Sequence, residues 1–218
     1  MLPTHPSTLL YFGGTFDPPH MAHVALPLLA MHALGADGVL YVPAARSPHK
    51  LAATQTPTPA HHRLAMLRLA LEHIPAAHVL TDELDRANTQ PDQPSYTVDT
   101  LESLRQRLGP DVTLRLLIGA DQLAVFHDWH RAQRIVQLAQ PLVMVRPPHT
   151  REALLASLSP GINREAWSAR FLDLPQLDLS ATALRRRAAL GHPLTGLVPP
   201  AVEDYIRRHH LYRQAMRL

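Results

Sequence analysis

The chain has 218 residues and a hydrophobic fraction of 46%, which suits a single domain over residues 1–218 built around one sizeable core. Its formal charge of +3 is too small to indicate a nucleic-acid or membrane partner, and the absence of cysteine excludes disulfides, thiolate zinc sites and cysteine nucleophiles. No basic segment leads an apolar run at the start, and no stretch approaches the roughly 20 apolar residues that span a bilayer, so we expect a cytoplasmic protein.

Short apolar runs alternate with helical spacing along the first half of the chain. The predicted strands are 8–12, 38–42 and 78–84, and the predicted helices are 21–34, 61–73 and 96–108. The first strand ends in two glycines before its helix begins. The polar segment 44–59, rich in Pro and Thr, is the longest irregular stretch, and its length indicates a functional or mobile loop.

The same alternation continues through the second half. The predicted strands are 112–118, 141–145 and 170–174, and the predicted helices are 131–138, 151–158, 181–190 and 200–210. The strongly apolar runs do not alternate with polar residues, which is typical of strands buried on both faces. The pattern predicts an α/β fold, a Rossmann-like doubly wound parallel sheet with helices on both faces. Ligands of such sheets lie at the carboxyl ends of the strands, where the winding reverses.

Residues 13–23, GGTFDPPHMAH, place two glycines at a strand end and two histidines at the start of a helix. Glycines let the backbone approach an anion closely, and the free N–H groups of a helix N-terminus attract negative charge. His20 and His23, three residues apart, share one face of that helix. This arrangement predicts a phosphate site. The alternative is that His20 caps the helix and His23 lies on the surface or in the core. Two histidines supply too few ligands for zinc, so we expect no metal site.

A second candidate phosphate segment is 179–185, LSATALR. Ser180 and Thr182 lie at the start of a predicted helix, where hydroxyl and backbone donors can reach phosphate oxygens. Arg185 can donate two parallel hydrogen bonds to a polyphosphate. The alternative is an ordinary helix capped by Ser180, with Arg185 and its two arginine neighbours in solvent.

The two segments together resemble the paired motifs of the nucleotidylyltransferase superfamily, GTFDPxHxxH and ISxTxIR. The second differs only by Leu for Ile at two apolar positions, and Ala22 stands where the family usually has Gly. The resemblance spans both ends of the domain and implies an ATP site. The implied ATP-binding residues are Gly13, Gly14, Thr15, Phe16, His20, His23, Ser180, Thr182 and Arg185.

Three further segments resemble the nicotinate-nucleotide adenylyltransferase family in particular: 47–50, 95–101, and 118–121 with 126–129. The residues that this resemblance implies for nicotinate mononucleotide are Lys50, Tyr96, Thr97, Asp121 and Trp129. Trp129 would stack on the pyridine ring, and Thr97 with nearby backbone N–H groups would hold the nicotinate carboxylate. Plainer roles stay open: Trp129 in the core, Tyr96 and Thr97 as a helix start, Asp121 as a helix cap and Lys50 as a surface lysine.

The implied reaction is in-line attack of the acceptor phosphate on the α-phosphorus of ATP, with pyrophosphate leaving and nicotinate adenine dinucleotide formed on the route to NAD. His20, His23, Lys50 and Arg185 would be the catalytic residues, meeting charge on the phosphate oxygens. Magnesium would arrive with ATP and needs few protein ligands. Two alternatives remain: another acceptor, namely nicotinamide mononucleotide, phosphopantetheine or FMN, or a non-catalytic nucleotide- or RNA-binding module.

Overall fold

The computed structural model describes residues 6–45, 56–90, 93–145, 149–158 and 163–213. Six strands form one sheet in the order β3-β2-β1-β4-β5-β6, and every neighbouring pair is parallel. The strands are β1 Thr8–Gly14, β2 Gly38–Pro43, β3 Ala77–Val79, β4 Thr113–Gly119, β5 Gln140–Met144 and β6 Phe171–Leu172. The chain builds outward from β1 on one side, returns to the centre, and builds outward from β4 on the other. This reversal confirms the predicted doubly wound sheet.

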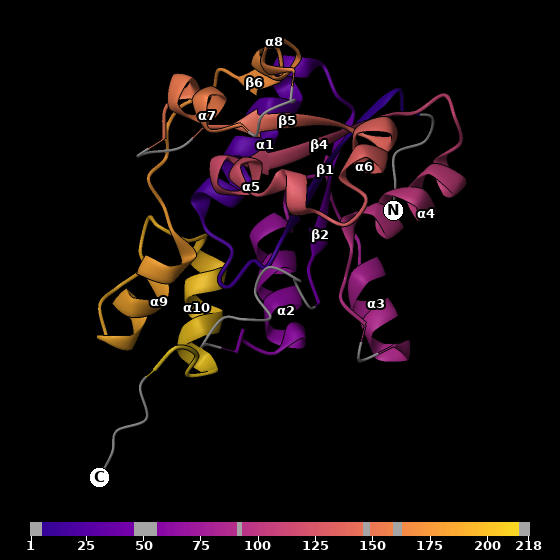
Figure 1. Ribbon diagram of the computed structural model, residues 1–218. Coiled ribbons are helices and arrows are strands. Elements are labelled where there is room, and N and C mark those ends of the chain that lie inside the picture. The colour runs from indigo at the N-terminus through magenta and orange to yellow at the C-terminus, as the bar shows by residue number, and fades with distance from the viewer. Residues whose placement is uncertain (1–5, 46–55, 91–92, 146–148, 159–162, 214–218) are drawn as a thin grey trace.

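Helices cover the sheet on both faces (Figure 1). They are α1 Met21–Leu34, α2 Ala60–Leu71, α3 Asp82–Thr89, α4 Thr97–Leu108, α5 Ala120–Ala124, α6 Ala132–Leu138, α7 Arg151–Ser157, α8 Arg164–Ser168, α9 Ala181–Ala189 and α10 Pro200–Arg208, with a short 3₁₀ turn, η2, at Phe126–Asp128. Apolar residues of α1, α2, α9 and α10 pack on one face, and those of α4 to α8 pack on the other.

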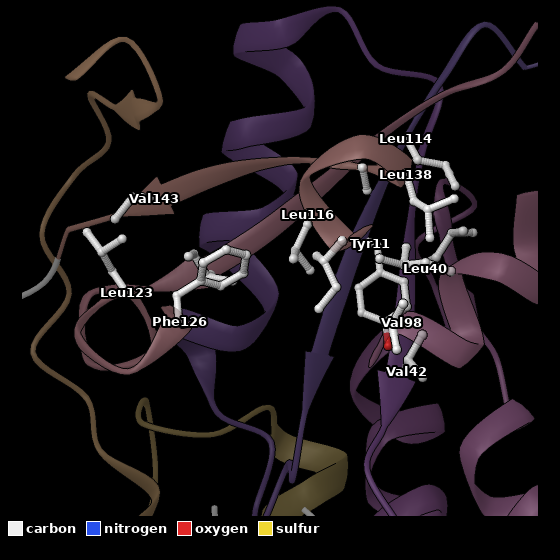
Figure 2. Packing of buried hydrophobic residues seen from close by; sticks show 14 of the residues in the cluster. Tyr11, Leu40, Val42, Val98, Leu114, Leu116, Leu123, Phe126, Leu138 and Val143 are labelled. Atoms are coloured by element: carbon white, nitrogen blue, oxygen red, sulfur yellow. The ribbon is translucent and has the colours of Figure 1, made fainter. Parts of the chain in front are cut away.

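The core consists of two hydrophobic clusters separated by the sheet. Successive residues of each central strand enter opposite clusters: Leu9 and Tyr11 of β1 face α4, whereas Leu10 and Phe12 face α1. The first of these clusters is shown in Figure 2, where Tyr11 lies among aliphatic side chains from the strands and α4. Burial on both faces explains why the central strands are apolar at most positions, with polar residues such as Thr8, Arg115 and Gln140 in their first halves.

One predicted element is wrong. The segment 78–84, which alternates like a strand, contains the end of the three-residue β3 and the start of α3. Asp82, Glu83 and Asp85 occupy the first turn of α3, where acidic side chains interact favourably with the positive end of the helix dipole. The acidic cluster therefore favours a helix start here more strongly than the short alternation favours a strand. The predicted strand 170–174 is also shorter in the structure, at Phe171–Leu172. It lies at the edge of the sheet, where a strand gains pairing from one side only.

Candidate active site

A cleft follows the carboxyl edge of the sheet, where β1 and β4 lie side by side and the winding reverses. Its volume is about 1340 Å³, larger than the roughly 300–1,000 Å³ of common small-ligand pockets and sufficient for two nucleotides. Every predicted site residue in the described part of the chain lines this cleft: Gly13, Gly14, Thr15, Phe16, His20, His23, Tyr96, Thr97, Asp121, Trp129, Ser180, Thr182 and Arg185. Lys50 lies outside the described residues.

The turn after β1 is tight because an aromatic ring lies beneath it. Phe16 is buried and has a left-handed backbone with φ of +50°, which non-glycine residues rarely adopt. A Cβ on Gly14 would come 3.1 Å from the Phe16 ring, and one on Gly13 would come 3.1 Å from the Tyr11 ring. Both glycines therefore bring the backbone closer to the core than a larger residue allows, and they leave its outer side open to the cleft.

The two histidines stack on each other at the start of α1. Their ring centroids are 3.6 Å apart with planes 17° from parallel, and the edge of Phe16 meets the His23 ring at 5.2 Å. The backbone N–H of His20 donates to His23 Nδ1 at 3.3 Å. Because Nδ1 accepts this bond, the proton of a neutral His23 lies on Nε2. His20 does occupy the N-cap position, so the capping alternative and the cleft-lining role both apply to it.

The second phosphate segment meets the first across 168 positions of sequence. Arg185 donates from Nη1 to the carbonyl oxygen of Asp17 at 2.8 Å and from Nη2 to Thr182 Oγ1 at 3.2 Å. Ser180 occupies the N-cap position of α9, but within the described contacts its hydroxyl makes no capping hydrogen bond, contrary to the capping prediction. The helix starts of α1 and α9 thus both adjoin the cleft, with the Arg185 guanidinium between them.

A buried network that the sequence analysis missed supports this junction. Asp17, 5% exposed, accepts hydrogen bonds from the Tyr212 hydroxyl at 2.6 Å and from the Thr58 backbone N–H at 3.1 Å. Arg63, 2% exposed, donates to the carbonyl oxygens of Thr15 at 2.8 Å and Thr58 at 2.9 Å. Burial lowers the pKa of Arg63, and the Asp17 carboxylate counteracts that shift. A buried charge supported in this way fixes the turn after β1 from behind.

The signal for Arg63 was present in the sequence. The buried positions of α2 are Arg63, Met66, Leu67, Ala70 and Leu71, a helical spacing that puts the arginine at the N-terminal end of an apolar stripe. An arginine at such a position needs internal acceptors for its five N–H donors. The contact of Tyr212 with Asp17 has no comparable signal, because it joins two segments 195 residues apart.

The other end of the cleft is formed by the start of α4 and the segment after η2. Tyr96 is the N-cap residue of α4 and Thr97 its first residue, so the free N–H groups of a 12-residue helix adjoin the cleft there. Trp129 is half-buried, packs on Phe126 with a centroid separation of 5.3 Å and lines the cleft, so core packing and ligand contact are compatible. Gly119, not Asp121, is the N-cap of α5, which makes the capping alternative for Asp121 wrong.

Beneath this end lies a buried acid that the sequence analysis did not select. The Tyr11 hydroxyl donates to Glu83 Oε1 at 3.2 Å, and both residues line the cleft. Burial raises the pKa of Glu83 to about 7 and raises that of Tyr11 well above its usual value. The mistaken strand at 78–84 concealed Glu83, because it gave no reason to expect this side chain at the cleft.

The donors along the cleft are imidazole, guanidinium, hydroxyl and backbone N–H groups, a set that suits phosphate oxygens. Within the described ranges, no group of three or more His, Asp or Glu side chains could hold a metal ion. None of the helices described is long and apolar enough to cross a membrane.

Comparison with known proteins gives consistent matches. The cytidylyltransferase-like family matches residues 11–187. A relative from Chromobacterium violaceum is 40% identical over 212 residues, covering 93% of this chain and 97% of its own. Another, from Stenotrophomonas maltophilia, is 39% identical over 220 residues, covering 95% and 97%. Both carry the name "Probable nicotinate-nucleotide adenylyltransferase". The Plasmodium falciparum nicotinic acid mononucleotide adenylyltransferase complexed with NaAD has a TM-score of 0.71 at 17% identity, covering 94% of this chain and 97% of its own, a likeness of fold.

Proposed function

This chain belongs to the nicotinate-nucleotide adenylyltransferase family, and we infer from that membership that it transfers the adenylyl group of ATP to nicotinate mononucleotide. The products are nicotinate adenine dinucleotide and pyrophosphate, which places the enzyme in NAD biosynthesis. The observation that best supports this function is the single cleft, in which two phosphate-binding helix starts lie at one end and a helix N-terminus with Trp129 lies at the other. A cytoplasmic location stays a prediction, in keeping with ATP as substrate.

We propose that the triphosphate of ATP binds at the end of the cleft formed by the two motifs. Backbone N–H groups of the turn at Gly13 and Gly14 and the starts of α1 and α9 supply donors and partial positive charge. His23 donates from Nε2, because its Nδ1 is occupied by the His20 backbone. Arg185 already lies at the junction and needs only to exchange its present carbonyl and hydroxyl acceptors for phosphate oxygens.

The acceptor is placed at the opposite end. The pyridine ring stacks on Trp129, and its carboxylate accepts from Thr97 and the free N–H groups at the start of α4. Asp121, an exposed carboxylate in the first turn of α5, is proposed to accept from ribose hydroxyls. Lys50 is proposed to neutralise phosphate charge between the two nucleotides.

The reaction needs positioning and charge stabilisation more than proton transfer. The acceptor phosphate, with a second pKa of about 6, is ionised near neutral pH and attacks without a general base. Its oxygen forms a bond to the α-phosphorus, and the bond from that phosphorus to the bridging oxygen breaks, so that pyrophosphate leaves with the electron pair. His20, His23, Lys50 and Arg185 stabilise the charge on the phosphate oxygens. Magnesium bound to ATP would supply positive charge toward the leaving pyrophosphate.

The test is pyrophosphate release by the purified protein with magnesium and ATP, with nicotinate mononucleotide and nicotinamide mononucleotide assayed in parallel. We expect a strong preference for the acid, with nicotinate adenine dinucleotide identified by mass. Equal use of both acceptors contradicts the carboxylate site at α4. Turnover only with phosphopantetheine or FMN contradicts the acceptor, and ATP binding without turnover on any acceptor supports a non-catalytic nucleotide-binding protein.

A further inference from the structure

A group of polar side chains from β1, α3 and α4 lies beneath the proposed acceptor end. Glu83, 4% exposed on the first turn of α3, accepts from the Tyr11 hydroxyl of β1 at 3.2 Å and from the backbone N–H of Ala45 beyond β2. Thr97, at the start of α4, is a further polar neighbour of Tyr11 and lowers the pKa of that hydroxyl, and both residues line the cleft. Figure 2 shows the Tyr11 ring among aliphatic residues, with its oxygen directed toward Val42 and Val98. Glu83, Tyr11 and Thr97 thus line the same part of the cleft, and Tyr11 lies between the buried carboxyl and the proposed carboxylate site.

The positive charges near Glu83 lower the pKa of its carboxyl by less than burial raises it. Arg86 and Asp82 face it from its own helix, Arg63 faces it from α2, and Tyr11 faces it from β1. Burial is the largest influence and raises the pKa of the carboxyl to about 7, Arg86 lowers it, and Asp82 raises it. Near neutral pH the side chain is thus close to evenly divided between its neutral and ionised forms, a state that a nearby ligand charge shifts easily.

We propose that Glu83 is a specificity-determining residue, and that binding of the acid acceptor takes up a proton at its carboxyl group. The proposal rests on the function proposed above, with the nicotinate carboxylate at Thr97. Two carboxylates a short distance apart in a site of low polarity do not both remain ionised at neutral pH. The ligand carboxylate is fixed as an anion by the N–H groups of α4, so the protein's carboxyl takes the proton. A neutral carboxamide at the same position imposes no such demand.

The proposal makes acceptor affinity depend on pH in a way that differs between the two acceptors. Affinity for nicotinate mononucleotide falls as Glu83 ionises, by up to about tenfold per pH unit above its pKa if only the protonated form binds. Affinity for nicotinamide mononucleotide does not follow this ionisation. The phosphate groups of the two acceptors titrate alike, so the ratio of the two KM values isolates the effect of Glu83.

The experiment measures KM for both acceptors from pH 6 to pH 8.5, in the wild type and in Glu83→Gln, whose amide oxygen retains an acceptor for the Tyr11 hydroxyl. For the wild type we expect the ratio of acid to amide KM to rise by up to about 30-fold over this range, and for Glu83→Gln we expect a flat ratio. Calorimetry at pH 8 in buffers of different ionisation enthalpy should detect proton uptake when the acid binds to the wild type, and none when it binds to the variant.

A second variant tests the direction of the effect. The Tyr11 hydroxyl lowers the pKa of Glu83 by donating to it, so Tyr11→Phe should move the rise in the KM ratio to higher pH. A flat wild-type ratio, or an equal rise in Glu83→Gln, overturns the inference even if turnover on the acid is normal. Absence of turnover on every acceptor instead overturns the proposed function. If Glu83→Gln does not fold, as judged by its thermal melt, the wild-type calorimetry and Tyr11→Phe decide the question.

Discussion

At the scale of single residues, Glu83 also makes stability depend on pH. Its pKa is raised from 4.5 to about 7 in the folded protein, so the folded state binds more protons than the unfolded state between these values. Its stabilising contribution is fully present below about pH 4.5 and is lost as pH rises through 7. We expect Glu83→Gln to raise the free energy of unfolding by about 3 kcal/mol more at pH 8 than at pH 4.5. Urea denaturation at both pH values measures this, and a pH-independent effect would contradict it.

His23 permits a sharper test of the chemistry. Its Nε2 donor is proposed to bind oxygens on which charge builds up in the transition state, so His23→Ala should lower kcat by about 10²–10³-fold with little change in acceptor KM. His32→Ala is the matched control, because His32 is exposed in the last turn of the same helix. Steady-state kinetics for both substrates separate the outcomes. A loss confined to ATP binding would remove the proposed transition-state role.

The residues of the two motifs could be predicted to line one site from the sequence alone. The buried residues that hold those motifs in place could not. His20, His23 and Arg185 were identified from spacing and resemblance, and the structure places all three along one cleft. Their contributions to catalysis stay predictions. Asp17 and Tyr212 had no local sign of their pairing, because a buried hydrogen bond between distant segments depends on how the sheet brings them together.

At the scale of elements, a cluster of histidines lies between α2 and α10, which pack side by side (Figure 1). His62 shares a hydrogen bond of 2.9 Å with the Tyr205 hydroxyl, and the His209 ring lies 5.2 Å from the His62 ring. Partial burial lowers the pKa of His62, and the charges of His61 and His209 lower it further. The folded state therefore favours neutral His62. The stability that this preference contributes is present above pH 6.5 and is lost as the pH falls below that value.

This cluster predicts that acid weakens the packing of α10. His209→Gln removes one of the repelling charges, so the fall in melting temperature between pH 7.5 and pH 5.5 should be smaller than in the wild type by about 1–2 °C, the shift that a fraction of a kcal/mol produces in a chain of this size. His73→Gln, an exposed change just beyond α2, is the control. Differential scanning calorimetry makes the comparison, and equal falls in both variants would contradict the prediction.

Element length decided which parts of the fold could be predicted. The helix at Met21–Leu34 was predicted to its exact bounds, because a long segment rich in Ala and Leu ends at Gly35, which adopts the left-handed conformation that stops a helix. The helices α5 and α8, five residues each, were not predicted, since fewer than two turns show no periodicity. Such short helices form because the surrounding core fixes them.

At the scale of the whole molecule, the ATP end is held together by contacts between the beginning and the end of the described chain. Tyr212→Phe removes the 2.6 Å donor to the buried Asp17 carboxylate, which should cost about 1–3 kcal/mol of stability. Because Asp17 also accepts Arg185 through its carbonyl, we expect KM for ATP to rise more than KM for the acceptor. Tyr205→Phe, on α10 but away from Asp17, is the control. Equal changes in both KM values would show a general loosening instead.

The order of the chain has a consequence for synthesis. Translation produces β1 and the histidine pair first, and all six strands are made by Leu172, so the sheet can form on the ribosome before α9 exists. The residues that close the ATP end, Arg185 and Tyr212, are synthesised only afterwards. A nascent chain with a finished sheet thus has only the first of the two predicted phosphate segments, and we expect it to bind nucleotide only near the end of translation.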